Sequence, residues 1–248
     1  MRKRRLRCES GIYHIILRGN NQQNIFDDDE DRYFFLSRLE KYSTSLNIDI
    51  YAYCLMGNHV HILIGKGNDL MSLLVKKLAC SYVYYFNHKY DRTGHLFQGR
   101  YKSEPVDSDE YFKTVYRYIL QNPEKAGICQ WFKYPWNSKY IIKHKENFIK
   151  ISYVYEIFDG KKNLINFLFE NNDDLCMEYN SVGLTKLKDD ELITVFIKRL
   201  FGITNIFEIN NFSSNIIQDR IKLLKLSGIK SDQLARLTGI SKKLINNV

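Results

Sequence analysis

Two histidines separated by a single residue, His59 and His61, are the first side chains whose spacing suggests chemistry. They follow the turn signal Gly57-Asn58 and stand in a run of β-branched and aliphatic residues, which predicts a strand. Successive side chains of a strand point to opposite faces, so both imidazoles share one face and apolar neighbours such as Val60 share the other. Such a pair is half of a metal site, although it is also common as ordinary half-exposed polar surface.

A second stretch supplies groups that this pair needs. Tyr118 and Asn122 are four residues apart in an expected helix over 108–121, and Pro123 predicts that this helix ends at or near Asn122. A carboxamide oxygen beside two imidazoles is a mixed N,O ligand set that suits manganese or magnesium. A phenol beside such a cation can attack a phosphodiester and become covalently linked to one DNA end. Spacing alone leaves Tyr116 as a competitor, and the tyrosines could also simply pack the helix on a sheet.

The elements that must position these groups follow from the periodicity of the chain. Strands are expected over 12–18, 48–55, 59–64 and 95–103, and helices over 27–47, 70–88 and 108–121. The order strand, helix, strand, strand, helix, strand predicts an α+β fold with a ferredoxin-like, split βαβ antiparallel sheet. Both crossover helices then cover one face, and the histidine pair points to the other, where the third helix is free to lie. His14 in the first strand is expected to be structural and has no assigned role.

His59-Val60-His61, together with Tyr-Ile-Leu-Gln-Asn-Pro-Glu-Lys-Ala-Gly over 118–127, resembles the single-tyrosine HUH transposases. The most similar branch is that of the REP-associated tyrosine (RAYT-like) transposases among the insertion-sequence single-strand transposases. Residues 97–103 and 134–138 also resemble segments of that family, and the resemblance covers residues 9–142.

The resemblance implies roles for individual residues. It implies metal ligands at His59, His61 and Asn122, and a nucleophile at Tyr118. Many relatives have Tyr-Ile-His-Leu-Asn-Pro where this chain has Leu and Gln between Ile119 and Asn122, which leaves open any role of the replaced histidine.

The activity that the resemblance implies is cleavage and rejoining of single-stranded DNA at hairpin-bearing sites through a 5′-phosphotyrosine. The expected cofactor is a divalent metal, magnesium or manganese, and the expected partner is single-stranded DNA with a hairpin, bound by a monomer or homodimer. Two alternatives are a catalytically silent DNA-binding regulator with the same fold and a replication-initiation or relaxase-like HUH nickase.

The charge and cysteine content agree with a nucleic-acid partner in a reducing compartment. Lys and Arg number 37 against 28 Asp and Glu, a formal net charge of +9 in 248 residues. The cysteines are odd in number and form no C-x-x-C pair, so neither a zinc finger nor a disulfide framework is expected. No signal peptide or membrane span is expected, and a cytoplasmic location is predicted. Arg100, Tyr101 and Lys102 are candidate DNA contacts, or equally a solvated strand edge.

Two domains are predicted: a catalytic domain over 1–142 and a helical C-terminal region over 143–248. Residues 214–247 resemble a helix-turn-helix, with Gly239 in the turn. Its second helix would offer Lys242, Lys243 and Asn246 to DNA. The alternative is a small helical bundle that packs on the catalytic domain.

Overall fold

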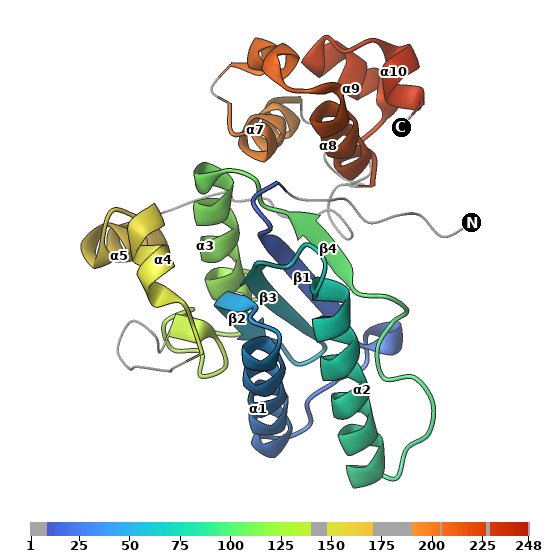
Figure 1. Ribbon diagram of the computed structural model, residues 1–248, viewed down its shortest axis with the longest axis vertical. Coiled ribbons are helices and arrows are strands. Elements are labelled where there is room, and N and C mark those ends of the chain that lie inside the picture. Colours follow the sequence, from blue (N-terminus) through green and yellow to red (C-terminus); the bar gives the residue numbers. More distant parts are fainter. Residues whose placement is uncertain (1–8, 140–147, 171–189, 204, 227–228, 248) are drawn as a thin grey trace. The chain divides into compact units, whose positions relative to one another are not determined.

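The computed structural model describes residues 9–139, 148–170, 190–203, 205–226 and 229–247 (Figure 1). The chain divides into two compact units: one is built around a β-sheet, and the other consists of the C-terminal helices and Ser108–Thr114. The predicted domain boundary at residue 142 falls within 140–147, outside the described residues, and stays a prediction.

Four strands form one antiparallel sheet. They are β1 (Tyr13–Arg18), β2 (Asp49–Leu55), β3 (His59–Gly65) and β4 (Lys102–Pro105), in the order β2-β3-β1-β4. Together with helical connections after β1 and β3, this order confirms the predicted ferredoxin-like fold. The fourth strand is shorter than expected, because Gly99 has a positive φ of 57° and interrupts the extended segment.

The connecting helices α1 (Asp29–Ser45) and α2 (Met71–Lys89) pack on one face of the sheet, as expected (Figure 1). The apolar side chains between these helices and the sheet are fully buried: they include Ile15, Leu17, Phe35, Leu39, Val60, Ile62, Leu74, Leu78 and Tyr82. A short 3-10 helix, η1 (Asn20–Gln22), follows β1. Burial of the apolar side of β3 therefore leaves the histidine side to face away from α1 and α2.

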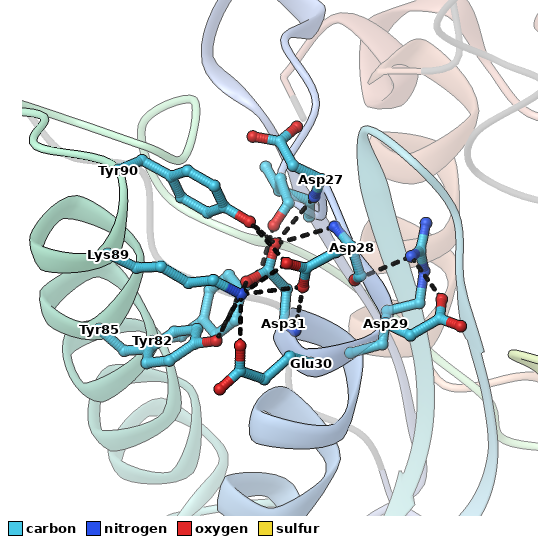
Figure 2. Close-up of polar contacts among 11 residues, drawn as sticks. Asp27, Asp28, Asp29, Glu30, Asp31, Tyr82, Tyr85, Lys89 and Tyr90 are labelled. Atoms are coloured by element: carbon cyan, nitrogen blue, oxygen red, sulfur yellow. Dashed lines mark hydrogen bonds and ion pairs between the residues drawn. The ribbon is translucent and has the colours of Figure 1, made fainter.

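An ionic cluster ties the end of α2 to the start of α1 (Figure 2). Lys89 Nζ lies 2.7 Å from the carboxylate of Asp28, 2.9 Å from that of Glu30 and 3.0 Å from that of Asp31. Asp28 and Asp31 also form the capping box that begins α1. The same acidic residues thus cap the start of α1 and bind the end of α2 to it.

The third long helix, α3 (Asp109–Lys125), is buried along most of its length. The prediction that it ends at or near Asn122 is wrong, since it continues through Pro123 to Lys125. Proline removes a single N–H, and the next turn still closes: the Ala126 N–H donates to the Asn122 carbonyl at 2.9 Å. The cost of the proline is therefore confined to the end of the helix.

The segment after α3 returns to the edge of β2. The Leu55 N–H donates to the Trp136 carbonyl at 2.8 Å, and the Tyr53 N–H donates to Ser138 Oγ at 3.0 Å. Asn137 Nδ2 donates to the Leu120 carbonyl of α3 at 3.1 Å. This return fixes α3 to the sheet of its own chain.

Two short helices, α4 (Ile151–Ile157) and α5 (Lys161–Phe169), complete the sheet unit. Side chains of α3 bind carbonyls at the end of α5: Arg117 Nη1 donates to Phe167 at 3.0 Å and Gln121 Nε2 donates to Leu168 at 2.8 Å. Gln121 stands in the stretch that departs from the expected family pattern, and its side chain has this structural partner.

The second unit contains α7 (Asp190–Phe201), η3 (Ile206–Asn211), α8 (Ser214–Leu226), α9 (Ser231–Thr238) and α10 (Lys242–Asn246). Gly239, with a φ of 72°, turns the chain between α9 and α10, and Ser241 caps α10. Leu234 and Ile245 are fully buried, so the last two helices pack through apolar contacts. No helix in the described part of the chain is long and apolar enough to cross a bilayer. The cytoplasmic location stays a prediction.

Candidate active site

The histidine pair lies on β3, on the sheet face opposite α1 and α2. His61 is fully buried and His59 is 9% exposed. The two ring centroids are 5.0 Å apart, with the planes almost perpendicular at 86°. The strand thus holds both imidazoles rigidly beside each other, as their spacing predicted.

His59 is held by one partner on each nitrogen. Its Nδ1 lies 2.6 Å from Asn58 Oδ1, which can only accept, so Nδ1 carries the proton and donates. Its Nε2 lies 3.3 Å from Asn122 Oδ1 on α3. In the neutral ring with the proton on Nδ1, Nε2 carries a lone pair, and a cation could then bind this nitrogen together with the carboxamide oxygen.

His61 is flanked by a second histidine that the sequence had left without a role. Its Nδ1 lies 2.8 Å from Nε2 of His14 on β1, and His14 Nδ1 lies 3.2 Å from Glu104 Oε2 on β4. The two ring planes are within 23° of each other, with centroids 5.1 Å apart, so the rings are joined edge to edge. A buried line of three side chains thus runs across three neighbouring strands.

Tyr118 brings a phenol to the same place. Its ring lies 5.7 Å from the His61 ring and 6.2 Å from the His14 ring, and it is 3% exposed. Lys125 Nζ lies 5.2 Å from the centre of the Tyr118 ring. The tyrosine is therefore placed between the histidines and a cation.

Tyr116, the competing tyrosine, has a different setting. Its ring packs edge-on against Phe158 of the segment after α4, with centroids 5.7 Å apart. Complete burial raises its pKa, since an apolar interior disfavours the phenolate. Tyr116 is thus a core residue, and Tyr118 is the tyrosine that lies with the histidines.

The predicted metal ligands His59, His61 and Asn122 therefore come together, with a donor set of two imidazoles and one carboxamide. Within the described residues, no cluster of three or more His, Cys, Asp or Glu side chains is placed to hold a metal ion. The His59 and Asn122 atoms that face each other make this mixed set compatible with a divalent cation. Metal binding itself stays a prediction.

The predicted DNA contacts of the sheet unit lie around the start of β4. Arg100 and Lys102 are exposed, and Tyr101 is half-buried, with its hydroxyl 3.0 Å from Ser72 Oγ. The DNA-contact role and the solvated-edge alternative both stay open.

The predicted contacts of the second unit all belong to α10. Lys242, Lys243 and Asn246 are exposed, and the Lys242 ammonium pairs with Asp232 of α9. Their role at DNA stays a prediction, as does that of the helix-turn-helix.

Sequence reasoning missed His14, Glu104, Asn58 and Lys125 as neighbours of the site. The signal for His14 and Glu104 was present only in the strand register, which pairs them directly across β1 and β4. That register depends on long-range pairing that a local pattern does not reveal. Asn58 was interpreted only as a turn residue, although its side chain hydrogen-bonds the adjacent His59.

Comparison with known proteins gives one family. Residues 8–122 match the model of the family described as "Transposase IS200 like", a range that contains the sheet, the histidine pair, Tyr118 and Asn122. A solved structure of a REP-associated tyrosine transposase bound to a REP hairpin is similar, with a TM-score of 0.47 and 16% identity, covering 57% of this chain and 84% of that chain. No curated protein matches this chain.

Proposed function

We propose that this protein is a metal-dependent, single-strand DNA transposase of the REP-associated type, a proposal supported by the match of residues 8–122 to the model of the IS200-like transposases. In this proposal Tyr118 is the nucleophile, and His59, His61 and Asn122 hold magnesium or manganese. The substrate is single-stranded DNA that carries a hairpin next to the cleavage site.

The observation that carries the proposal is the meeting of two distant segments. The histidines come from β3 and the tyrosine and carboxamide from α3, yet His59 Nε2 and Asn122 Oδ1 are 3.3 Å apart and the His61 and Tyr118 rings are in contact. A set assembled for core packing alone would not need two imidazoles, a carboxamide and a phenol to meet at one buried point.

The chemistry follows from these groups. Tyr118 Oη attacks the scissile phosphorus, the P–O3′ bond breaks, and the DNA is left with a 5′-phosphate on the tyrosine and a free 3′-hydroxyl. A bound divalent cation supplies Lewis-acid polarisation of the phosphate. Attack by a 3′-hydroxyl on the phosphotyrosine reverses the step and rejoins two ends. Lys125 offers a positive charge beside the phosphate that the tyrosine receives.

The second unit has a separate task in this proposal. The exposed side chains of α10 bind duplex DNA, such as the stem of a hairpin, while the sheet unit acts on the adjoining single strand. The net charge of +9 favours both contacts, since each phosphate neutralised releases counterions.

A denaturing gel tests the nucleophile. The protein is incubated with Mn²⁺ and end-labelled single-stranded DNA from the flanks of its own gene, as wild type, Tyr118→Phe and Tyr116→Phe. We expect a labelled protein–DNA band for the wild type and Tyr116→Phe, and its loss in Tyr118→Phe or with chelator.

The other outcomes separate the alternatives. If all three proteins bind this DNA but none gives a band, the regulator replaces the transposase. Cleavage at an origin hairpin, with none at the flanks of the gene, would instead favour the replication nickase.

A further inference from the structure

We propose that His14 and Glu104 are positioning residues that fix the proton of His61 on Nδ1 and so direct its Nε2 to the metal. The inference rests on the proposed function, because it concerns how one of the proposed ligands is held. It adds two residues to the site, neither of which is a proposed metal ligand or the proposed nucleophile.

The strand register builds the line. His14 and Glu104 are direct partners across β1 and β4, and His61 pairs with Ile16 two residues along β1 from His14. All three side chains therefore lie on the same face of the sheet, on neighbouring strands. Their exposures are 0% for His14 and His61 and 1% for Glu104, so bulk water does not compete for these hydrogen bonds.

The direction of the protons follows from what each atom can do. The Glu104 carboxylate only accepts, so His14 Nδ1 carries a proton and donates to it across 3.2 Å. When His14 is neutral, its Nε2 has a lone pair and accepts from His61 Nδ1 across 2.8 Å. The remaining nitrogen of His61, Nε2, is left with the lone pair that a metal requires.

The same tautomer of His59 is set by a single hydrogen bond to its neighbour in the sequence. Asn58 Oδ1 accepts from its Nδ1 at 2.6 Å, which leaves Nε2 as the ligand atom. Both proposed imidazole ligands are therefore oriented by a hydrogen bond at Nδ1, the nitrogen that would not bind the metal. The repetition of this arrangement in two unrelated ways is the pattern expected for a metal site, in which outer partners set the tautomer and ring angle of histidine ligands.

The competing explanation is that the His14–Glu104 pair only stabilises the sheet. A stabilising pair changes the melting temperature when it is broken, but it has no effect on the tautomer of His61 or on metal affinity in the folded protein. Those two quantities therefore decide between the explanations.

The experiment measures Mn²⁺ binding to the full, metal-free chain without DNA, by the loss of the free-Mn²⁺ electron paramagnetic resonance signal. The variants are Glu104→Gln, whose amide can donate or accept and so no longer imposes a direction, and His14→Phe, which keeps an aromatic ring but removes both nitrogens. His61→Ala reports loss of the ligand. Asp31→Asn is the matched control, because it alters another fully buried carboxylate, in the Lys89 cluster on the helical side of the sheet.

We expect Kd for Mn²⁺ to rise about 10- to 100-fold in Glu104→Gln and in His14→Phe, and to stay unchanged in Asp31→Asn. A long-range ¹H–¹⁵N spectrum of the metal-free protein should show one His61 tautomer in the wild type and a mixture in Glu104→Gln. If one of the two variants fails to fold, the other decides.

Two results would overturn the inference, and they are distinguishable. Unchanged affinity and an unchanged His61 tautomer in the folded variants, with binding lost in His61→Ala, would reject the positioning role and leave the proposed metal site standing. Equal Mn²⁺ binding in the wild type and His61→Ala, or no binding in either, would reject the metal site together with the inference.

Discussion

Asn122 contributes one oxygen atom to the proposed metal site, and this oxygen faces His59 Nε2. Asn122→Asp keeps an oxygen in that position and adds charge, so it should bind Mn²⁺ at least as tightly as the wild type. Asn122→Leu removes the ligand at similar volume and should weaken binding by about 10-fold or more. Calorimetric titration of the metal-free proteins measures both, and equal affinity in Asn122→Leu and wild type would exclude Asn122 as a ligand.

Individual residues also mark where sequence reasoning succeeded and where it stopped. The alternation of a strand brought His59 and His61 to one face, and helical spacing brought Tyr118 and Asn122 to another, so each pair was predictable locally. Spacing could not choose between Tyr116 and Tyr118, because that choice depends on how α3 is rotated against the sheet. His14 and Glu104 were missed for the same reason, since only the pairing of β1 with β3 and β4 brings them to His61.

At the element scale, the Lys89 cluster joins α1 to α2 and should make stability depend on pH (Figure 2). The pKa of Asp28 is lowered from 3.8, chiefly by its hydrogen bond with Lys89 and then by the Asp31 backbone N–H. A carboxyl group with a lowered folded-state pKa stabilises the fold above its unfolded value and loses that contribution as pH falls through the folded value. The ion pair between Lys89 and Asp28 is therefore intact at neutral pH and is lost only in acid.

The Lys89→Met variant tests the contribution of the Lys89 cluster to stability. Its melting temperature should lie a few degrees below that of the wild type at pH 7, and the gap should narrow as pH falls through the lowered pKa of Asp28, where this carboxylate loses its charge. Circular dichroism melts at several pH values measure the gap, with the exposed Lys76→Met on the same helix as the control. A gap that stays constant down to the most acidic pH at which both proteins still fold would exclude these ion pairs as its source.

The elements themselves were largely predictable, because period-2 and period-3.6 patterns are long and regular in β1 to β3 and in α1 to α3. The end of α3 was not, since the rule for residues before proline describes a tendency and the backbone here closes one more turn. The late start of β4 likewise follows from Gly99, whose positive φ breaks the extended segment.

At the scale of the whole molecule, the positive charge and the C-terminal helices predict a salt-dependent second contact with DNA. If α10 binds a phosphate through Lys243, then Lys243→Gln should reduce the slope of log K against log salt by about 1 for hairpin DNA. Lys161→Gln, at an exposed position of α5, is the control. Fluorescence anisotropy at several salt concentrations measures the slope, and equal slopes for all three proteins would remove α10 from the DNA interface.

The nucleophile is tested most directly by locating the DNA-linked residue by mass spectrometry. Trypsin cleaves after Arg117, so Tyr116 and Tyr118 fall on separate peptides, and the peptide from Tyr118 to Lys125 contains one tyrosine. After reaction with Mn²⁺ and hairpin-bearing single-stranded DNA, followed by nuclease digestion, we expect a nucleotide linked through its 5′-phosphate to Tyr118 and none on the Tyr116 peptide. A remnant on Tyr116 or another residue, with Tyr118 unmodified, would contradict the assignment of the nucleophile and of the site built around it.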